Sequence, residues 1–103
     1  MDKQFGLMQE DIETIINILK DEVGVEQAII FGSRAKGNYR NGSDVDIALK
    51  GEKVNFGTIS NILYLLNEET MMPYRFDVLN YNTISNKSLK EHIDRAGKIL
   101  YSH

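Results

Sequence analysis

The sequence contains no cysteine, and this absence excludes disulfide bonds and thiolate metal sites. No apolar run approaches the ~20 residues that a membrane-spanning helix needs, and the first residues lack a signal-peptide pattern. We therefore expect a cytoplasmic protein without a membrane partner. With one proline and no linker-like tract, the 103 residues are expected to form a single domain over residues 1–103.

Positive charge is also scarce. Lysine and arginine together number 12, against 15 aspartates and glutamates, which gives a net charge of -3 at pH 7. A nucleic-acid-binding surface needs clustered lysines and arginines that neutralise phosphates, so we expect no direct nucleic-acid binding. Hydrophobic residues make up 42% of the chain, which is enough for the core of a small domain.

A phosphate-binding turn is predicted at the end of a short buried strand. The run Ala-Ile-Ile-Phe over residues 28–31 predicts the strand, and Gly32 and Ser33 then begin a single helical turn. The first amides of a helix have no partner within it and attract phosphate oxygens. Gly32 lets a ligand approach the backbone closely, and the Ser33 hydroxyl can join the contact. The basic residues Arg34, Lys36 and Arg40 follow, and we interpret this group as triphosphate-binding, with a solvated loop as the alternative.

Two carboxylates come next, on a strand predicted over residues 44–49. In an extended strand, residues i and i+2 share a face about 6.6 Å apart, so Asp44 and Asp46 point the same way and the apolar residues that alternate with them point into a core. Adjacent carboxylates repel each other, and a hard cation such as Mg2+ removes that repulsion. A Gly-Ser turn or an Asp-x-Asp pair alone is an ordinary surface feature. Together they indicate a nucleoside triphosphate with its magnesium.

The whole string, Gly-Ser-x-Ala-x-Gly from Gly32 and then Ser-Asp-x-Asp from Ser43, resembles the signature of the DNA polymerase β-like nucleotidyltransferase superfamily. Within it, the chain is similar to the minimal nucleotidyltransferases, the MNT proteins of bacteria and archaea. That family uses a third carboxylate on a neighbouring strand. Residues 74–79 alternate as a strand with Asp77 on the face opposite to its apolar residues. The resemblance makes Asp77 the third acid, whereas the pattern alone also fits a solvated face.

The remaining patterns predict the order of the elements. We expect a helix over 12–23 that ends near Gly24, a strand to residue 31, a strand over 44–49, a helix over 56–66, a strand over 74–79 after Pro73, and a helix over 89–96. The predicted fold class is α/β (α+β): a small mixed β-sheet with helices packed on one face, in the polymerase β-like nucleotidyltransferase fold. The other face is expected to stay open and to carry the three carboxylates.

Several single residues are given structural roles. Ser88 and Glu91 have the spacing of a capping box at the start of the last helix. Phe56 and Tyr64 are interpreted as packing residues of the helix over 56–66. His92 is interpreted as a surface residue.

The resemblance implies transfer of AMP from ATP, with two Mg2+ ions bound together with the nucleotide. Its metal-binding and catalytic residues are Asp44, Asp46 and Asp77, where Asp77 completes the ion on the side of the nucleophile. Its nucleotide-binding residues are Gly32, Ser33, Arg34 and Lys36, of which the last two neutralise pyrophosphate. Nothing in these residues selects the base.

The acceptor is implied by the family alone. MNT proteins are commonly the antitoxin partner of a HEPN-domain RNase, and members silence that toxin by transferring AMP to one of its tyrosines. Two alternatives remain. The chain could block a HEPN partner by contact without catalysis. It could also be the catalytic subunit of a small-molecule nucleotidyltransferase, completed by a homo- or hetero-oligomer.

Overall fold

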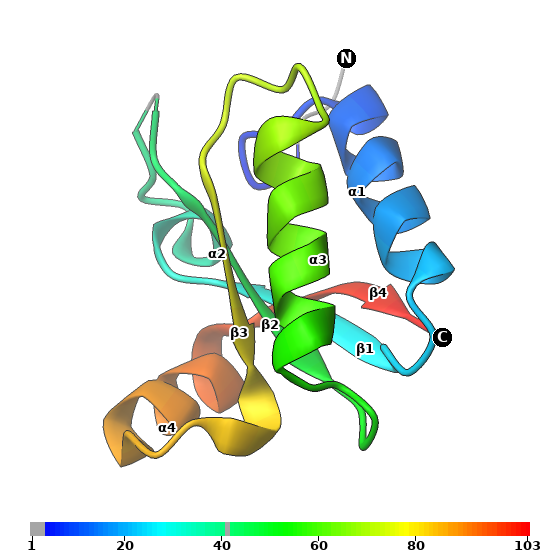
Figure 1. The fold of residues 1–103 in the computed structure, drawn as a ribbon. Helices are drawn as coiled ribbons and strands as arrows, with labels where there is room; N and C mark the ends of the chain where they lie inside the picture. Colours follow the sequence, from blue (N-terminus) through cyan, green and yellow to red (C-terminus); the bar gives the residue numbers. More distant parts are fainter. Residues whose placement is uncertain (1–3, 41) are drawn as a thin grey trace.

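The computed structural model describes residues 4–40 and 42–103 (Figure 1). Its helices are α1 (Gln9–Asp21), the single turn α2 (Ser33–Lys36), α3 (Phe56–Glu68), the 3-10 turn η1 (Tyr81–Thr83) and α4 (Lys87–Ala96). Its strands are β1 (Gln27–Phe31), β2 (Val45–Lys50), β3 (Phe76–Asn80) and β4 (Lys98–Ser102). The described helices of 13 residues, α1 and α3, are the longest, and no helix in the described part of the chain could cross a membrane.

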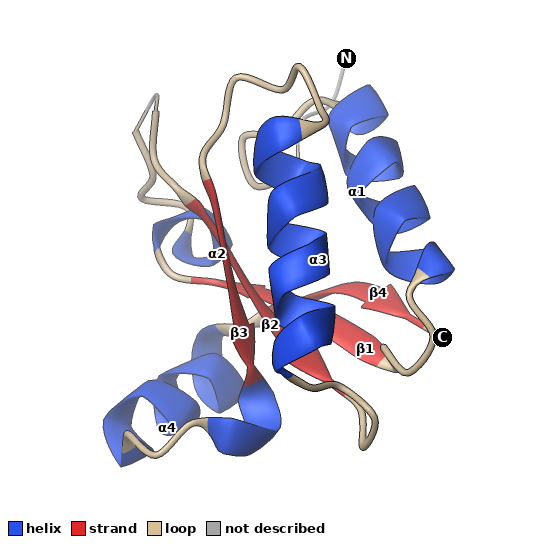
Figure 2. Cartoon of the chain, in the orientation of Figure 1, coloured by secondary structure: helices blue, strands red, loops and turns tan. Residues whose placement is uncertain are grey.

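The four strands form one mixed sheet in the order β3-β2-β1-β4 (Figure 2). β1 pairs antiparallel with both β2 and β4, whereas β2 and β3 run parallel and are joined by the crossover helix α3. In this register Asp46 lies between Phe31 on β1 and Asp77 on β3. The predicted mixed sheet and its fold class are therefore confirmed.

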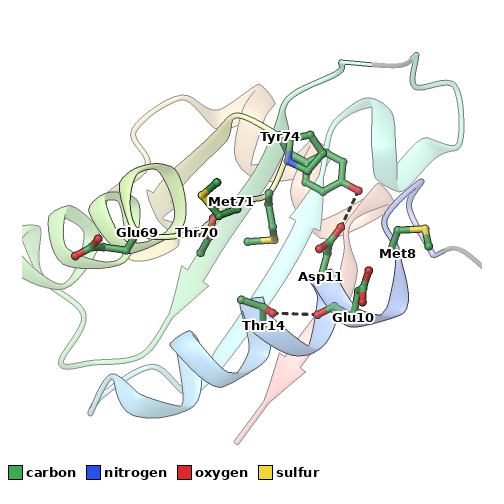
Figure 3. Close-up of a pocket in the computed structure, with 10 residues that line it drawn as sticks. Met8, Glu10, Asp11, Thr14, Glu69, Thr70, Met71 and Tyr74 are labelled. Carbon is green, nitrogen blue, oxygen red and sulfur yellow. Dashed lines mark hydrogen bonds between the residues drawn. The ribbon is translucent and has the colours of Figure 1, made fainter.

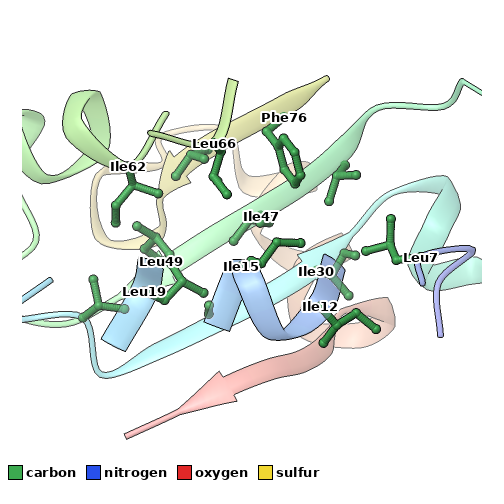
Figure 4. Close-up of a cluster of buried hydrophobic side chains, with 14 of the residues drawn as sticks. Leu7, Ile12, Ile15, Leu19, Ile30, Ile47, Leu49, Ile62, Leu66 and Phe76 are labelled. Atoms are coloured by element: carbon green, nitrogen blue, oxygen red, sulfur yellow. The ribbon is translucent and has the colours of Figure 1, made fainter. Parts of the chain in front are cut away.

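The main core lies between the sheet and helices α1 and α3, which lie side by side on one face of the sheet (Figures 1 and 4). Val45, Ile47 and Leu49 of β2 are completely buried there, as their alternation with the aspartates predicted. The helices contribute the apolar stripes of amphipathic sequences, including Ile15 and Ile62. This packing fixes β2 with its polar residue Asp46 on the opposite face.

The opposite face of the sheet is not left entirely open. A second apolar cluster joins Ile29, Phe31 and Ala48 of the sheet to Ile93 of α4. Since alternate residues of β1 and β2 are apolar on this face too, one end of the face needs a covering helix. The end that carries Asp46 and Asp77 keeps the exposure that the sequence suggested, with Asp46 half-buried and Asp77 exposed.

Several helix ends differ from their predicted positions. α1 ends at Asp21, so Val23 falls beyond the helix and is 85% exposed. The side chain of Asn86 caps α4 by accepting from the Leu89 amide, so the capping box predicted at Ser88 is wrong. A capping box does exist, between Asn55 and Thr58 at the start of α3.

Two further differences concern exposure and pairing. Phe56 and Tyr64 were expected to pack, yet they are 85% and 54% exposed because they lie on the outer side of α3. The sequence pattern predicts no strand after the last helix, but this segment forms β4. Pairing with β1 supplies its backbone hydrogen bonds, which a short sequence pattern does not reveal.

Candidate active site

In the turn that follows β1, the backbone lies directly beside a carboxylate. Gly32 has φ +77, a conformation that side chains rarely adopt, and α2 begins with the next residue, Ser33. A Cβ atom built on Gly32 would lie 2.6 Å from Oδ2 of Asp46. Glycine is therefore required at this position for two reasons, its backbone conformation and the closeness of a carboxylate. The predicted phosphate turn and the predicted cation ligand are direct neighbours in space.

The carboxylates of Asp46 and Asp77 lie on adjacent strands of the same sheet face. Their residues are opposite each other in the parallel pairing of β2 and β3. Burial raises the pKa of the Asp46 carboxyl above its ordinary value of 3.8, and the negative charges of Asp77 and Asp44 raise it further, while Arg34 lowers it. Asp44 stands just before β2 and is exposed. The site thus concentrates negative charge that Arg34 offsets only in part.

The three acids do not form a complete metal site by themselves. Within residues 4–40 and 42–103, no three acidic, histidine or cysteine side chains lie close enough to hold one ion. Asp44 precedes β2, so strand pairing does not fix its position beside Asp77. The chemistry of the donors nevertheless fits magnesium: the ligands are carboxylate oxygens, and their mutual repulsion is what a divalent cation relieves. Phosphate oxygens of a nucleotide would have to complete the coordination.

Arg34, interpreted from the sequence as a triphosphate ligand, is buried, and its guanidinium binds the protein's own backbone. It is only 3% exposed, and its guanidinium donates to the backbone carbonyl oxygens of Ser43 (3.1 Å from Nε, 2.7 Å from Nη2) and Phe5 (2.9 Å from Nη1). Its Cζ atom also lies 5.3 Å and 5.2 Å from the ring centroids of Tyr39 and Tyr74. A sequence pattern could not reveal this role, because the partners come from distant segments.

The other predicted ligands keep positions compatible with their roles. Ser33 is half-buried at the start of α2, and Lys36 is exposed at its end. Residue 41, inside the loop between α2 and β2, lies outside the described residues.

His92, interpreted as a surface residue, is half-buried and packs edge-on against Phe31, with 6.4 Å between ring centroids. The helical position of His92 is visible in the sequence, but its contact with β1 depends on how α4 crosses the sheet.

Comparison with known proteins shows the family to which the chain belongs. The family described as Polymerase beta, Nucleotidyltransferase matches residues 13–103. A candidate protein adenylyltransferase of Methanocaldococcus jannaschii is 31% identical over 93 residues, which cover 89% of this chain and 93% of that protein.

Solved structures share the same fold at lower sequence identity. A toxin-antitoxin structure with AMP-PNP is similar with a TM-score of 0.74 and 20% identity, over 89% of this chain and 73% of that chain. A toxin-antitoxin MntA-HepT structure is similar with a TM-score of 0.69 and 18% identity, over 93% of this chain and 74% of that chain. At this level of identity, the likeness establishes how the elements are arranged.

Proposed function

We propose that this chain, which belongs to the polymerase beta nucleotidyltransferase family, is a magnesium-dependent enzyme that transfers AMP from ATP to a hydroxyl group of a partner protein. The partner we infer is a HEPN-domain toxin modified on a tyrosine, so that the chain acts as a cytoplasmic antitoxin. Family membership rests on the match over residues 13–103 and on the 31% identity to the archaeal relative. Nucleotidyl transfer is the activity of this family.

One observation carries the proposal: the glycine turn at Gly32 touches the carboxylate of Asp46, which in turn lies opposite Asp77. A bound triphosphate needs an anion-binding backbone next to a cation-binding carboxylate, because its phosphates carry their magnesium with them. A turn that serves only the fold does not require a carboxylate directly beside its backbone. The raised pKa of Asp46 also fits a carboxyl placed beside other acids to hold a cation.

Each residue at the site has a proposed task. Ser33 and the backbone beside Gly32 would bind the β and γ phosphates, and Lys36 would neutralise the departing pyrophosphate. Asp44, Asp46 and Asp77 would hold magnesium, which supplies charge stabilisation for the phosphoryl oxygens when it is bound. Asp77 is exposed on the open end of the sheet face, so it could also accept the proton of the incoming hydroxyl. Arg34 is left out of this set because it is buried and three of its five N–H groups already donate to the protein's own carbonyl oxygens.

The acceptor assignment is supported by the names of the similar proteins. The archaeal relative is named for protein adenylylation, and the similar solved structures are of toxin-antitoxin assemblies, one with the ATP analogue AMP-PNP. Each of these names describes that other protein. Our proposal extends them to this chain because the turn and the acid pair at its site suit the same reaction.

The test is to incubate the purified chain with ATP, magnesium and the HEPN protein encoded beside it, and to measure the mass of that protein. We expect the mass of AMP to be added to a tyrosine. Asp77→Asn should stop this addition yet allow the complex to form, because the variant keeps the side chain's shape and removes its charge. If Asp77→Asn inhibits the toxin equally well without any mass change, the non-catalytic antitoxin is the correct function. If AMP is transferred to a small molecule instead, the small-molecule alternative is correct.

A further inference from the structure

A groove rich in methionine lies between the start of α1 and the segment that follows α3 (Figure 3). It is an open hollow of about 610 Å³, on the side of the sheet away from the carboxylates. Met71 is 99% exposed, and Met8 and Met72 are half-buried beside it. We call these three residues, with the hollow they line, the methionine groove.

The exposure of Met71 is unusual for a large apolar side chain. Apolar residues clustered around a hollow on a small protein mark an interaction surface more often than residues exposed one by one. Methionine suits such a surface because its unbranched, polarisable side chain adapts to different partners. The groove therefore offers an apolar surface to a partner segment that inserts from outside.

The rim of the methionine groove is acidic. Glu10 and Asp11 contribute from α1 and Glu69 from the end of α3, and among residues 4–40 and 42–103 the lining of the hollow includes no lysine or arginine. Asp11 is held in place because its Oδ2 accepts a hydrogen bond of 2.9 Å from the Tyr74 hydroxyl (Figure 3). An acidic rim around an apolar floor favours a partner segment that combines apolar and basic side chains.

The methionine groove borders a second hollow beside the loop that leads to β2. Pro73 and Tyr74 line the groove and also line this second hollow, which they share with Arg34 and Tyr39. The ring of Tyr74 packs against the Arg34 guanidinium, and Arg34 holds the carbonyl group that precedes Asp44. A segment bound in the groove would thus place the rest of its protein next to the catalytic end of the sheet.

We propose that the methionine groove binds the acceptor protein itself, through a segment with apolar and basic residues, and so holds that protein while its hydroxyl enters the active site. This inference rests on the proposed function, because its occupant is the protein that receives AMP. It goes further by separating the surface that binds the acceptor from the residues that carry out transfer.

The experiment compares groove variants with matched controls on the opposite parts of the surface. Met71→Ser removes the exposed apolar side chain, and Val23→Ser is its control, since Val23 is also exposed but lies outside the groove. The double variant Glu10→Lys with Glu69→Lys reverses the rim charge, and the double variant Glu52→Lys with Glu91→Lys, at two exposed positions outside the groove, is its control with the same change in net charge. Binding to the neighbouring HEPN protein is measured by calorimetry at low and high salt, and ATP binding is measured for each variant.

We expect the groove variants to bind the HEPN protein at least about tenfold more weakly and the controls to stay within about twofold of the parent. KM for the acceptor should rise while kcat and ATP binding stay unchanged, because the groove touches neither the nucleotide nor the reacting atoms. Groove variants that bind like the parent would disprove binding of the acceptor at the groove and leave the proposed function intact. Failure of the parent chain to bind the HEPN protein would overturn the proposed partner and, with it, this inference.

Discussion

The guanidinium of Arg34 donates two hydrogen bonds to the carbonyl oxygen of Ser43, at 3.1 Å from Nε and 2.7 Å from Nη2. Arg34 directly follows the Gly32–Ser33 turn, and Ser43 directly precedes Asp44. The contact therefore ties the two halves of the sequence motif together across the loop between them. It fixes the backbone at the point where the chain enters β2, and so it determines where Asp44 stands.

Replacing Arg34 should destabilise the protein. Arg34→Met leaves the partly buried carbonyl groups of Ser43 and Phe5 without their donors, so we expect the free energy of unfolding to fall by about 1–3 kcal/mol. Arg34→Lys should recover only part of this loss, because an ammonium group lacks the planar fork of donors. Urea unfolding measures both variants, with Lys36→Met on the exposed end of α2 as control. An Arg34→Met variant as stable as the control would contradict the structural role.

Gly32→Ala should impair the site through Asp46. The new Cβ atom would lie 2.6 Å from the Asp46 carboxylate, so that side chain must move. Gly37→Ala is the control for a positive φ: its left-handed conformation (φ +87, ψ 1) strains alanine less than that of Gly32 (φ +77, ψ -155), and an added Cβ meets nothing within 4 Å. We expect Gly37→Ala to lose about 1 kcal/mol of stability and Gly32→Ala to lose more, and only Gly32→Ala to lose AMP transfer. Similar activity of the two variants in a single-turnover assay would rule out this coupling.

The stability of the protein should depend on pH through Asp46. Burial and the neighbouring acids raise the pKa of this carboxyl in the folded state above 3.8, so its ionisation costs folding free energy at higher pH. We expect Asp46→Asn to melt at a higher temperature than the parent at about pH 7, with the difference shrinking as the pH falls towards about 4. Scanning calorimetry over this range tests the sign. The control is Asp21→Asn at the exposed end of α1, and a difference for Asp46→Asn that does not change with pH would disprove the assignment.

Removing either aspartate of the β2 pair should abolish transfer without unfolding the protein. Asp44 is exposed and Asp46 half-buried, so Asp44→Ala and Asp46→Ala remove charge and open no sizeable cavity in the core. Ser33→Ala should be milder and should weaken ATP binding, because the backbone amides still contact phosphate. Transfer is assayed by mass and folding by circular dichroism. Aspartate variants that transfer AMP at the parent rate, or that unfold, would show that the site has been misplaced.

ATP binding should require magnesium. Acids that repel one another at the site would also repel the phosphates of a metal-free nucleotide. We expect calorimetric titration with ATP to give a binding signal in the presence of Mg2+ and a much weaker one with a chelator. Equal binding in both conditions would count against the proposed role of the carboxylates.

The sequence predicted the positions of residues that depend on a local pattern. It did not predict contacts between segments that are far apart in the chain. Alternation along β2 correctly separated Asp46 from the buried residues on either side of it, and β3 lies beside β2 with Asp77 opposite Asp46, as the family resemblance implied. The role of Arg34 could not be predicted, because its position in the motif places it beside phosphates and its burial depends on Phe5, far away in the chain. β4 was missed for the same reason, since its pairing with β1 joins the two ends of the chain.

The parallel pairing of β2 and β3 has a consequence for how the protein becomes active as it folds. Asp46 and Asp77 are separated in sequence by the whole of α3, and they become neighbours only when that crossover closes and β3 docks beside β2. Closing the segment between these two residues costs conformational entropy, so a contact of this range forms late in folding. A chain from which β3 has not yet emerged at the ribosome cannot hold both carboxylates together. The ability to bind nucleotide should therefore appear late, with the docking of β3, and a partly synthesised chain would be inert.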